Sequence, residues 1–138
     1  MAKKPDKALI AAALRARRHA SAPYSRFRVG AALRTLDGTI ITGANVESAS
    51  YGLTCCAERI ALFKAITEGY REFAAIAIAA RWPGGAMPCG ACRQLLAEYA
   101  PDAEVWVVDS AHPDRPKRFK TSTLLPHAFR MSTREKTD

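Results

Sequence analysis

Two short cysteine clusters contain the residues of this sequence that are best suited to do chemistry. The first reads Cys-Ala-Glu at 56–58, and the second reads Pro-Cys-Gly-Ala-Cys at 88–92. Both fall where we expect helices to start, and there the unpaired amides and the positive dipole end lower thiol pKa values. Cys89 and Cys92 lie three positions apart, so both sulfurs can face one ion, and Cys56 can supply a third ligand. Three protein ligands leave one tetrahedral position for water, which is the arrangement of a catalytic zinc site.

A fourth protein ligand would close the site and make it structural. Cys55 is a poor candidate because adjacent residues on a helix point about 100° apart, and we interpret it as a small buried hydrophobic residue. His19, His112 and His127 have no partner at ligand spacing and are expected on the surface or in loops. A thioredoxin-like redox pair would also use Cys-x-x-Cys, but the third cysteine, Cys56, favours a metal site.

Glu58 and Arg59 follow the first cluster's cysteine. An acidic residue in the first helical turn can be there for dipole reasons alone. Because Glu58 is two positions from a predicted ligand, we expect its carboxylate beside the open zinc position, where it can move protons. Zinc with three thiolates carries a net negative charge, which weakens it as a Lewis acid. We therefore expect the Arg59 guanidinium to donate to the sulfurs, although a solvated surface arginine would fit the same position.

Turn signals and hydrophobic periodicity divide the chain into alternating helices and strands. The Asp-Gly pair at 37–38 is a hairpin signal, and the apolar run at 73–80 predicts a strand buried on both faces. We expect helices at 8–19, 56–69, 88–99 and 124–129, strands at 29–36, 39–42, 73–80, 105–108 and 119–120, and a polar loop at 111–118. The strand–helix–strand spacing predicts a parallel pair. The expected fold class is α/β, a mixed sheet with helices on its faces.

The size and composition fit a single domain over residues 1–138, with flexible tails expected at 1–6 and 131–138. Of the 138 residues, 49% are hydrophobic and 25% charged, which is ordinary for a globular protein. The longest apolar run is too short to cross a bilayer. Asp6 and the arginines at 15, 17 and 18 argue against an export signal. We therefore expect a cytoplasmic protein, with no membrane association, whose thiols stay reduced.

The formal net charge is +8, and the positive residues gather at 3–18 and 117–136. A basic patch can bind nucleic acid. A solvated helix face and a loose tail explain the same pattern, and we do not expect a nucleic-acid partner.

The cysteine motifs stand within a longer pattern. Cys-Ala-Glu followed by Pro-Cys-x-x-Cys is the signature of zinc deaminases, and from about residue 8 to residue 129 the chain resembles the small homotetrameric zinc-dependent cytidine deaminases. The matching segments are Pro-Tyr-Ser-Arg-Phe at 23–27, Val-Gly-Ala-Ala-Leu at 29–33, Gly-x-Asn-x-Glu at 43–47, Cys-Ala-Glu-Arg at 56–59, Pro-Cys-Gly-Ala-Cys-Arg-Gln at 88–94 and Leu-Leu-Pro at 124–126. The resemblance implies that family's three-layer fold, a five-stranded mixed sheet with helices on both faces.

The resemblance also implies a cofactor and a reaction. One Zn²⁺ per chain would be bound by Cys56, Cys89 and Cys92, and Glu58 would be the proton shuttle. Zinc-activated hydroxide would attack C4 of the base. Cytidine and 2′-deoxycytidine would thereby be hydrolysed to uridine and 2′-deoxyuridine with release of ammonia, a reaction of pyrimidine salvage.

Substrate contacts follow from the same resemblance. Phe27 would stack on the pyrimidine, Asn45 and Glu47 would bind the sugar hydroxyls, and Ala57 would also contact the substrate. Without the resemblance, Phe27 would be interpreted as a core aromatic residue and the two polar residues as parts of a turn.

Tyr51 and Phe129 resemble the aromatic residues that reach a neighbouring subunit's pocket in this family, which implies a homotetramer with shared active sites. Three positions depart from the family's pattern. Arg28 stands where proline is usual, Ala44 where cysteine is frequent and Ser48 where asparagine is frequent. Arg28 adjoins the expected base-stacking residue and leaves the substrate preference open.

Three other functions stay open from the sequence. A deaminase of RNA or DNA cytosine must accept phosphates on both sides of its target, and Glu47 would repel a 3′ phosphate. A deaminase of another small cytosine compound, such as blasticidin, shares the zinc signature, whereas Phe27 and Asn45 match a nucleoside. A non-enzymatic zinc-binding module would not need Glu58.

Overall fold

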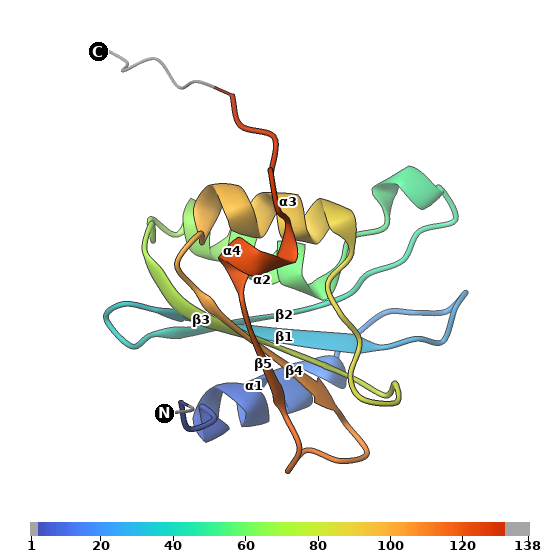
Figure 1. Cartoon of the computed structure of the whole chain (residues 1–138). Coiled ribbons are helices and arrows are strands. Elements are labelled where there is room, and N and C mark those ends of the chain that lie inside the picture. Colours follow the sequence, from blue (N-terminus) through green and yellow to red (C-terminus); the bar gives the residue numbers. More distant parts are fainter. Residues whose placement is uncertain (1–2, 132–138) are drawn as a thin grey trace.

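A mixed sheet of five strands forms the middle layer of the protein (Figure 1). The computed structural model describes residues 3–131. Its elements are α1 (Lys7–Arg17), β1 (Val29–Thr35), β2 (Ile40–Ala44), the 3₁₀ turn η1 (Tyr51–Leu53), α2 (Ala57–Thr67), β3 (Phe73–Ala80), α3 (Gly90–Tyr99), β4 (Glu104–Asp109), β5 (Lys117–Lys120) and α4 (Thr121–Leu124). Within this described range, no helix is both long enough and apolar enough to cross a membrane.

The strand order across the sheet is β2-β1-β3-β4-β5. β3 and β4 run parallel, as their spacing predicted, and the other neighbouring pairs are antiparallel. β1 and β2 form the hairpin predicted around the Asp-Gly pair at 37–38. The predicted fold class, an α/β fold with a mixed five-stranded sheet, is confirmed.

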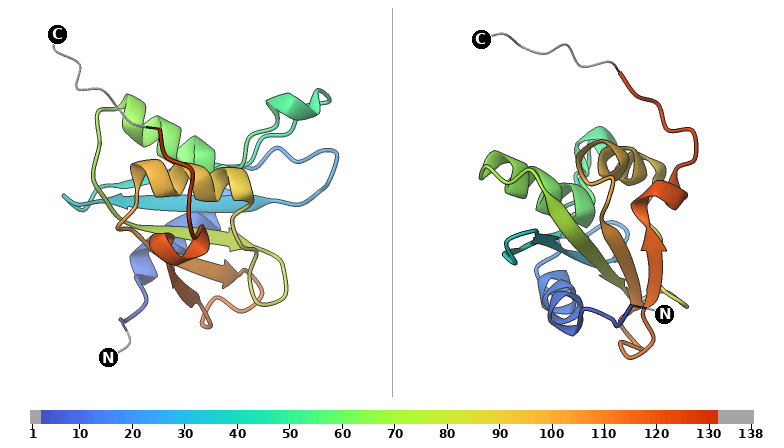
Figure 2. Two further views of the ribbon diagram at one scale, coloured as in Figure 1. Left: turned by 45° about the horizontal axis from the view of Figure 1, so that its top comes forward. Right: turned by 60° about the vertical axis from the view of Figure 1, so that its left-hand side comes forward.

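Residues alternate along β3 between the two faces of the sheet. Ile76 and Ile78 belong to the core beneath α2 and α3, whereas Ala75, Ala77 and Ala79 belong to the core beneath α1. The small alanine side chains leave room for α1 to lie close to the sheet. Helices therefore cover both faces, with α1 on one side and α2 and α3 on the other (Figure 2).

Close backbone contact at Gly43 sets the position of α2 above β2. A Cβ atom at this position would lie 2.6 Å from the backbone nitrogen of Ala61 and 2.7 Å from the carbonyl oxygen of Ala57. No side chain fits between this strand and this helix. The contact fixes the first turn of α2, which carries the Cys-Ala-Glu motif.

The two cysteine-bearing helices begin at the same edge of the sheet. α2 ends before β3 begins and α3 begins after β3 ends, so each helix runs back along β3 and their N-termini meet at its carboxyl end (Figure 1). Cys56 and Cys89 are the N-cap residues of the two helices, and both have extended backbones. The helices predicted from positions 56 and 88 thus begin one and two residues later, at Ala57 and Gly90.

The chain ends depart from the predictions in two ways. The predicted terminal helix at 124–129 is wrong, because α4 ends at Leu124. Pro126 has no amide to continue a helix, and His127 has a left-handed φ of 54°. The expected tail at 1–6 is anchored where it is described, because Asp6 accepts a hydrogen bond from the Leu9 amide at 3.1 Å and caps α1. The remaining tail positions, 1–2 and 132–138, lie outside the described residues.

Replacing Gly43 by Ala should lower the free energy of unfolding by about 1–3 kcal/mol, because the new methyl group overlaps the backbone of α2. Urea denaturation measures this change. Gly52→Ala is the matched control, since a Cβ there meets nothing within 4 Å. Equal stability of the two variants would show that the close contact does not constrain α2.

Candidate active site

Three cysteine sulfurs converge where α2 and α3 begin. The Sγ atoms of Cys56 and Cys89 are 3.9 Å apart, those of Cys89 and Cys92 are 3.5 Å apart, and all three lie within 4.8 Å of one another. Zinc–sulfur bonds of about 2.3 Å in a tetrahedron place the sulfurs about 3.8 Å apart. The spacing therefore fits one zinc ion, and the predicted grouping of these cysteines is confirmed.

Cys55 does not belong to this group. It is half-buried rather than buried as predicted, and desolvation raises the pKa of its thiol. The histidines at 19, 112 and 127 are exposed, as expected, and none of them is in the group within the described residues. The described chain thus offers three sulfur ligands and leaves one tetrahedral position open.

Cys56 lies in an environment that favours its thiolate. A hydrogen bond from the Cys92 thiol, together with Arg59, lowers the pKa of Cys56 to about 5, and the same hydrogen bond raises the pKa of Cys92. The Arg59 Nη2 atom lies 3.3 Å from Cys56 Sγ and 3.4 Å from the carbonyl oxygen of Thr54. Arg59 thus stands where the sequence argument placed it, with its guanidinium donating to a sulfur ligand.

Glu58 is buried directly beside the sulfurs, with 5% of its surface exposed. Burial raises the pKa of its carboxyl group, and the nearby Cys56 thiolate raises it further. Glu58 lies in the first turn of α2, two positions after the N-cap residue Cys56. The structure thus places a buried carboxyl group with a raised pKa beside the three sulfurs.

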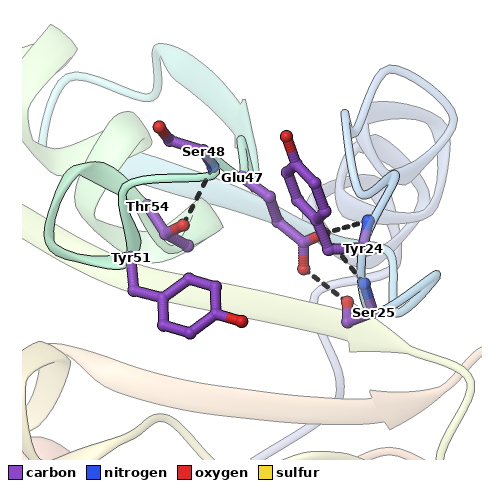
Figure 3. Close-up of a pocket in the computed structure, with 6 residues that line it drawn as sticks. All are labelled: Tyr24, Ser25, Glu47, Ser48, Tyr51 and Thr54. Carbon is purple, nitrogen blue, oxygen red and sulfur yellow. Dashed lines mark hydrogen bonds between the residues drawn. The ribbon is translucent and has the colours of Figure 1, made fainter.

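A hollow of about 410 Å³ opens between the segment that carries Tyr24 and the segment that carries Glu47 and Tyr51 (Figure 3). Glu47 is held at one wall of it: its Oε1 atom accepts hydrogen bonds from the amides of Tyr24 at 3.0 Å and Ser25 at 3.1 Å, and its Oε2 atom accepts one from the Ser25 hydroxyl. These bonds lower the pKa of Glu47. The hollow is lined by Tyr24, Ser25, Glu47, Ser48, Tyr51 and Thr54.

Asn45 is buried and holds the segment that carries Phe27. Its Oδ1 atom accepts a hydrogen bond from the Val29 amide at 2.8 Å, and its Nδ2 atom donates to the carbonyl oxygen of Phe27, also at 2.8 Å. An amide group carries two N–H donors, and the bond to Phe27 uses one of them. Asn45 therefore fixes the backbone beside the hollow and keeps a second donor for a ligand.

Phe27 is half-buried, and its ring contacts a residue that the sequence analysis did not single out. Its centroid lies 6.1 Å from that of Trp82, with the two planes at 83°. Ser25 was also missed as an individual residue, although its hydroxyl accepts a hydrogen bond from the Phe27 amide at 3.0 Å. Serine two positions before the bonded amide is a local signal that could have identified it.

Tyr51 and Phe129 lie apart in the single chain. Tyr51, which is 84% exposed, lines the same hollow as Glu47 (Figure 3). Phe129 is 69% exposed and lines a different hollow beside Tyr99, at the end of α3 away from Cys89. The structure thus does not bring Phe129 to the sulfur group of its own chain, and the role of both residues toward a neighbouring subunit stays a prediction.

Comparison with known proteins gives the class to which this fold and site belong. A family model described as the cytidine and deoxycytidylate deaminase zinc-binding region matches residues 3–108. The chain therefore belongs to this family, and zinc is the metal that its three cysteines are suited to hold.

Individual relatives are similar over most of the chain. A protein named cytidine deaminase from Halalkalibacterium halodurans is 52% identical over 88% of this chain and 91% of its own length. One of the same name from Sporosarcina psychrophila is 53% identical over 88% of each. The crystal structure of cytidine deaminase from Burkholderia pseudomallei superposes with a TM-score of 0.86 at 50% identity, covering 91% of this chain and all of that one.

Replacing Cys89 by Ser should reduce the zinc content of the purified protein by at least about tenfold, because an alcohol is a far weaker zinc ligand than a thiolate. Metal analysis of the dialysed protein measures this. Cys55→Ser is the matched control and should keep its zinc. Unchanged zinc content in Cys89→Ser, or zinc loss in Cys55→Ser as large as in Cys89→Ser, would contradict a site made of Cys56, Cys89 and Cys92 alone.

Proposed function

We propose that this protein catalyses the hydrolytic deamination of cytidine and 2′-deoxycytidine to uridine and 2′-deoxyuridine, with release of ammonia. The observation that carries the proposal is the buried Glu58 carboxyl group beside three sulfurs at zinc-binding spacing. Relatives named cytidine deaminase, 52% and 53% identical over most of the chain, support the choice of substrate.

Zinc held by the three cysteines supplies a Lewis acid that acidifies water. Glu58 would take one proton from the attacking water and pass it to N3 while the water oxygen bonds to C4. It would then take the second proton from that oxygen and pass it to the amine, which leaves as ammonia when its bond to C4 breaks. The raised pKa of Glu58 suits both directions of transfer. Arg59 withdraws charge from the Cys56 sulfur through its hydrogen bond and so offsets the negative charge of three thiolates.

Phe27, Asn45 and Glu47 recognise a free nucleoside. Phe27 stacks on the pyrimidine, and the remaining Asn45 N–H and the Glu47 carboxylate bind the sugar hydroxyls. The Ala57 side chain is fully buried, so its contribution to substrate binding is its backbone amide, one of the unpaired donors at the start of α2. Glu47, whose pKa is lowered, stays ionised and disfavours a 3′ phosphate, which speaks against a nucleic-acid substrate despite the net charge of +8.

We further propose that the enzyme acts in the cytoplasm. The thiol chemistry supports this, because three free cysteines must stay reduced to bind zinc.

Glu58→Gln should lower kcat for cytidine by at least about 10²-fold, because the amide cannot shuttle protons, while zinc content and stability stay unchanged. Ammonia and uridine release, measured before and after chelation, test this. The control is Glu68→Gln, an exposed carboxylate at the opposite end of α2. Normal turnover by Glu58→Gln would rule out the assignment of Glu58. A wild-type enzyme that releases no uridine would refute the proposed function itself.

The proposal includes a homotetramer with shared active sites. Large apolar side chains stay exposed around the hollow and near the C-terminus: Tyr51 is 84% exposed, Leu53 74%, Phe129 69% and Met131 74%. Apolar surfaces of this kind are typical of protein interfaces. A second copy of the chain that covered them could place Phe129 in its neighbour's pocket.

Mixing two inactive variants should restore activity if sites are shared. Glu58→Gln and Phe129→Ala each impair every site in their own tetramers. Random mixed tetramers contain sites with an intact Glu58 from one chain and an intact Phe129 from another, so about a quarter of wild-type activity should return. Co-refolding followed by turnover measurements and native mass spectrometry tests this. No recovery in tetramers whose mass shows that they contain both variants would exclude shared sites.

A further inference from the structure

The loop between β3 and α3 carries two different parts of the site. It begins with Arg81 and Trp82 after β3 and ends with Cys89, the N-cap of α3. The Trp82 amide donates to the carbonyl oxygen of Ala80 at 3.1 Å, and the Gly85 amide donates to the carbonyl oxygen of Trp82 at 2.8 Å. Trp82 is therefore held at both of its backbone groups.

Gly85 fastens this loop to the sheet. Its φ of 92° is a conformation that glycine adopts readily and other residues rarely adopt. A Cβ atom at this position would lie 2.6 Å from the Val107 side chain on β4. Close contact with a buried strand leaves the loop little freedom to move. The indole of Trp82 thus projects from a fixed base, although 57% of the residue is exposed.

The segment with Phe27 is fixed differently. Its backbone is held by the Ser25 hydroxyl at the amide, 3.0 Å away, and by the Asn45 side chain at the carbonyl oxygen, 2.8 Å away. These bonds set the position of the chain but not the rotation of the ring. The ring meets Trp82 edge to face, at 6.1 Å between centroids and 83° between planes, which is a favoured aromatic geometry.

We propose that Trp82 is a positioning residue for substrate binding: it holds the Phe27 ring in the orientation that stacks on the pyrimidine. This inference rests on the proposed function and adds a residue that orients the base-stacking ring. The same loop carries Cys89, a proposed zinc ligand, and Trp82, which packs against Phe27. The positions of the metal and of the base therefore depend on one segment of the chain.

Losing this support should affect binding rather than chemistry. Without Trp82 the Phe27 ring gains rotational freedom, which stacking on the substrate must then remove. Trp82 belongs neither to the sulfur group nor to the lining of the Glu47 hollow, so the proton transfers are unaffected. An edge-to-face pair corresponds to about a 2- to 12-fold effect on an equilibrium.

Steady-state kinetics of the holoenzyme with cytidine test this inference. Trp82→Ala should raise KM by about 2- to 12-fold with less than about a 2-fold change in kcat. Trp82→Phe, which keeps an aromatic ring, should restore KM to within about 2-fold of wild type. Leu36→Ala is the control, because Leu36 is an exposed apolar residue, 63% exposed, in the hairpin at the other end of β1.

Fluorescence with uridine gives a readout that does not depend on turnover. The protein has two tryptophans, and Trp106 is 4% exposed in the core beneath α1. Uridine should therefore change the emission of wild-type protein through Trp82, and the change should disappear in Trp82→Phe while uridine still binds by calorimetry.

Two results would overturn the inference while leaving the deaminase assignment intact: an unchanged KM in Trp82→Ala, or a fall in kcat accompanied by loss of zinc. The first would show that the Phe27 ring needs no support, and the second would show that Trp82 stabilises the metal loop instead. Failure of the wild-type protein to bind uridine or deaminate cytidine would instead refute the proposed function.

Discussion

The convergence of three sulfurs at the carboxyl end of β3 is the constraint on which the rest of the site depends. Cys56 caps α2 and Cys89 caps α3, and both helices return along the same strand. Because two helix N-termini meet there, backbone amides and dipoles favour thiolates at the place where zinc must sit. Close packing of Gly43 against the backbone of α2 sets the distance of that helix from the sheet, and Cys56 at its start lies near Cys89 and Cys92.

The charged groups around the three sulfurs partly offset one another. Three thiolates around one zinc ion would leave a net negative charge, and the Arg59 guanidinium offsets part of it by donating a hydrogen bond to the Cys56 sulfur. Glu58 lies in the same environment, and burial and the neighbouring thiolate raise the pKa of its carboxyl group. The Cys56 sulfur thus attracts the Arg59 cation and opposes ionisation of Glu58.

The substrate side of the site is built as one connected network. Glu47 is bound by Tyr24 and Ser25, Ser25 is bound to Phe27, and Asn45 ties Phe27 to the start of β1. Residues that we assign to the sugar therefore also shape the backbone of the residue that we assign to the base. A substitution at any of them should be expected to disturb both contacts, which matters when kinetic effects are attributed to a single hydrogen bond.

The sequence alone predicts the α/β class, the hairpin, β3 and the grouping of the three cysteines, because turn residues, periodicity and cysteine spacing are local features. It misplaced the last helix, where Pro126 and the left-handed His127 override apolar pattern. The contact of Trp82 with Phe27 and the two hydrogen bonds of the Asn45 side chain became visible only in the folded chain. These contacts join residues far apart in the chain, and no local pattern records which loops will meet at the edge of a folded sheet.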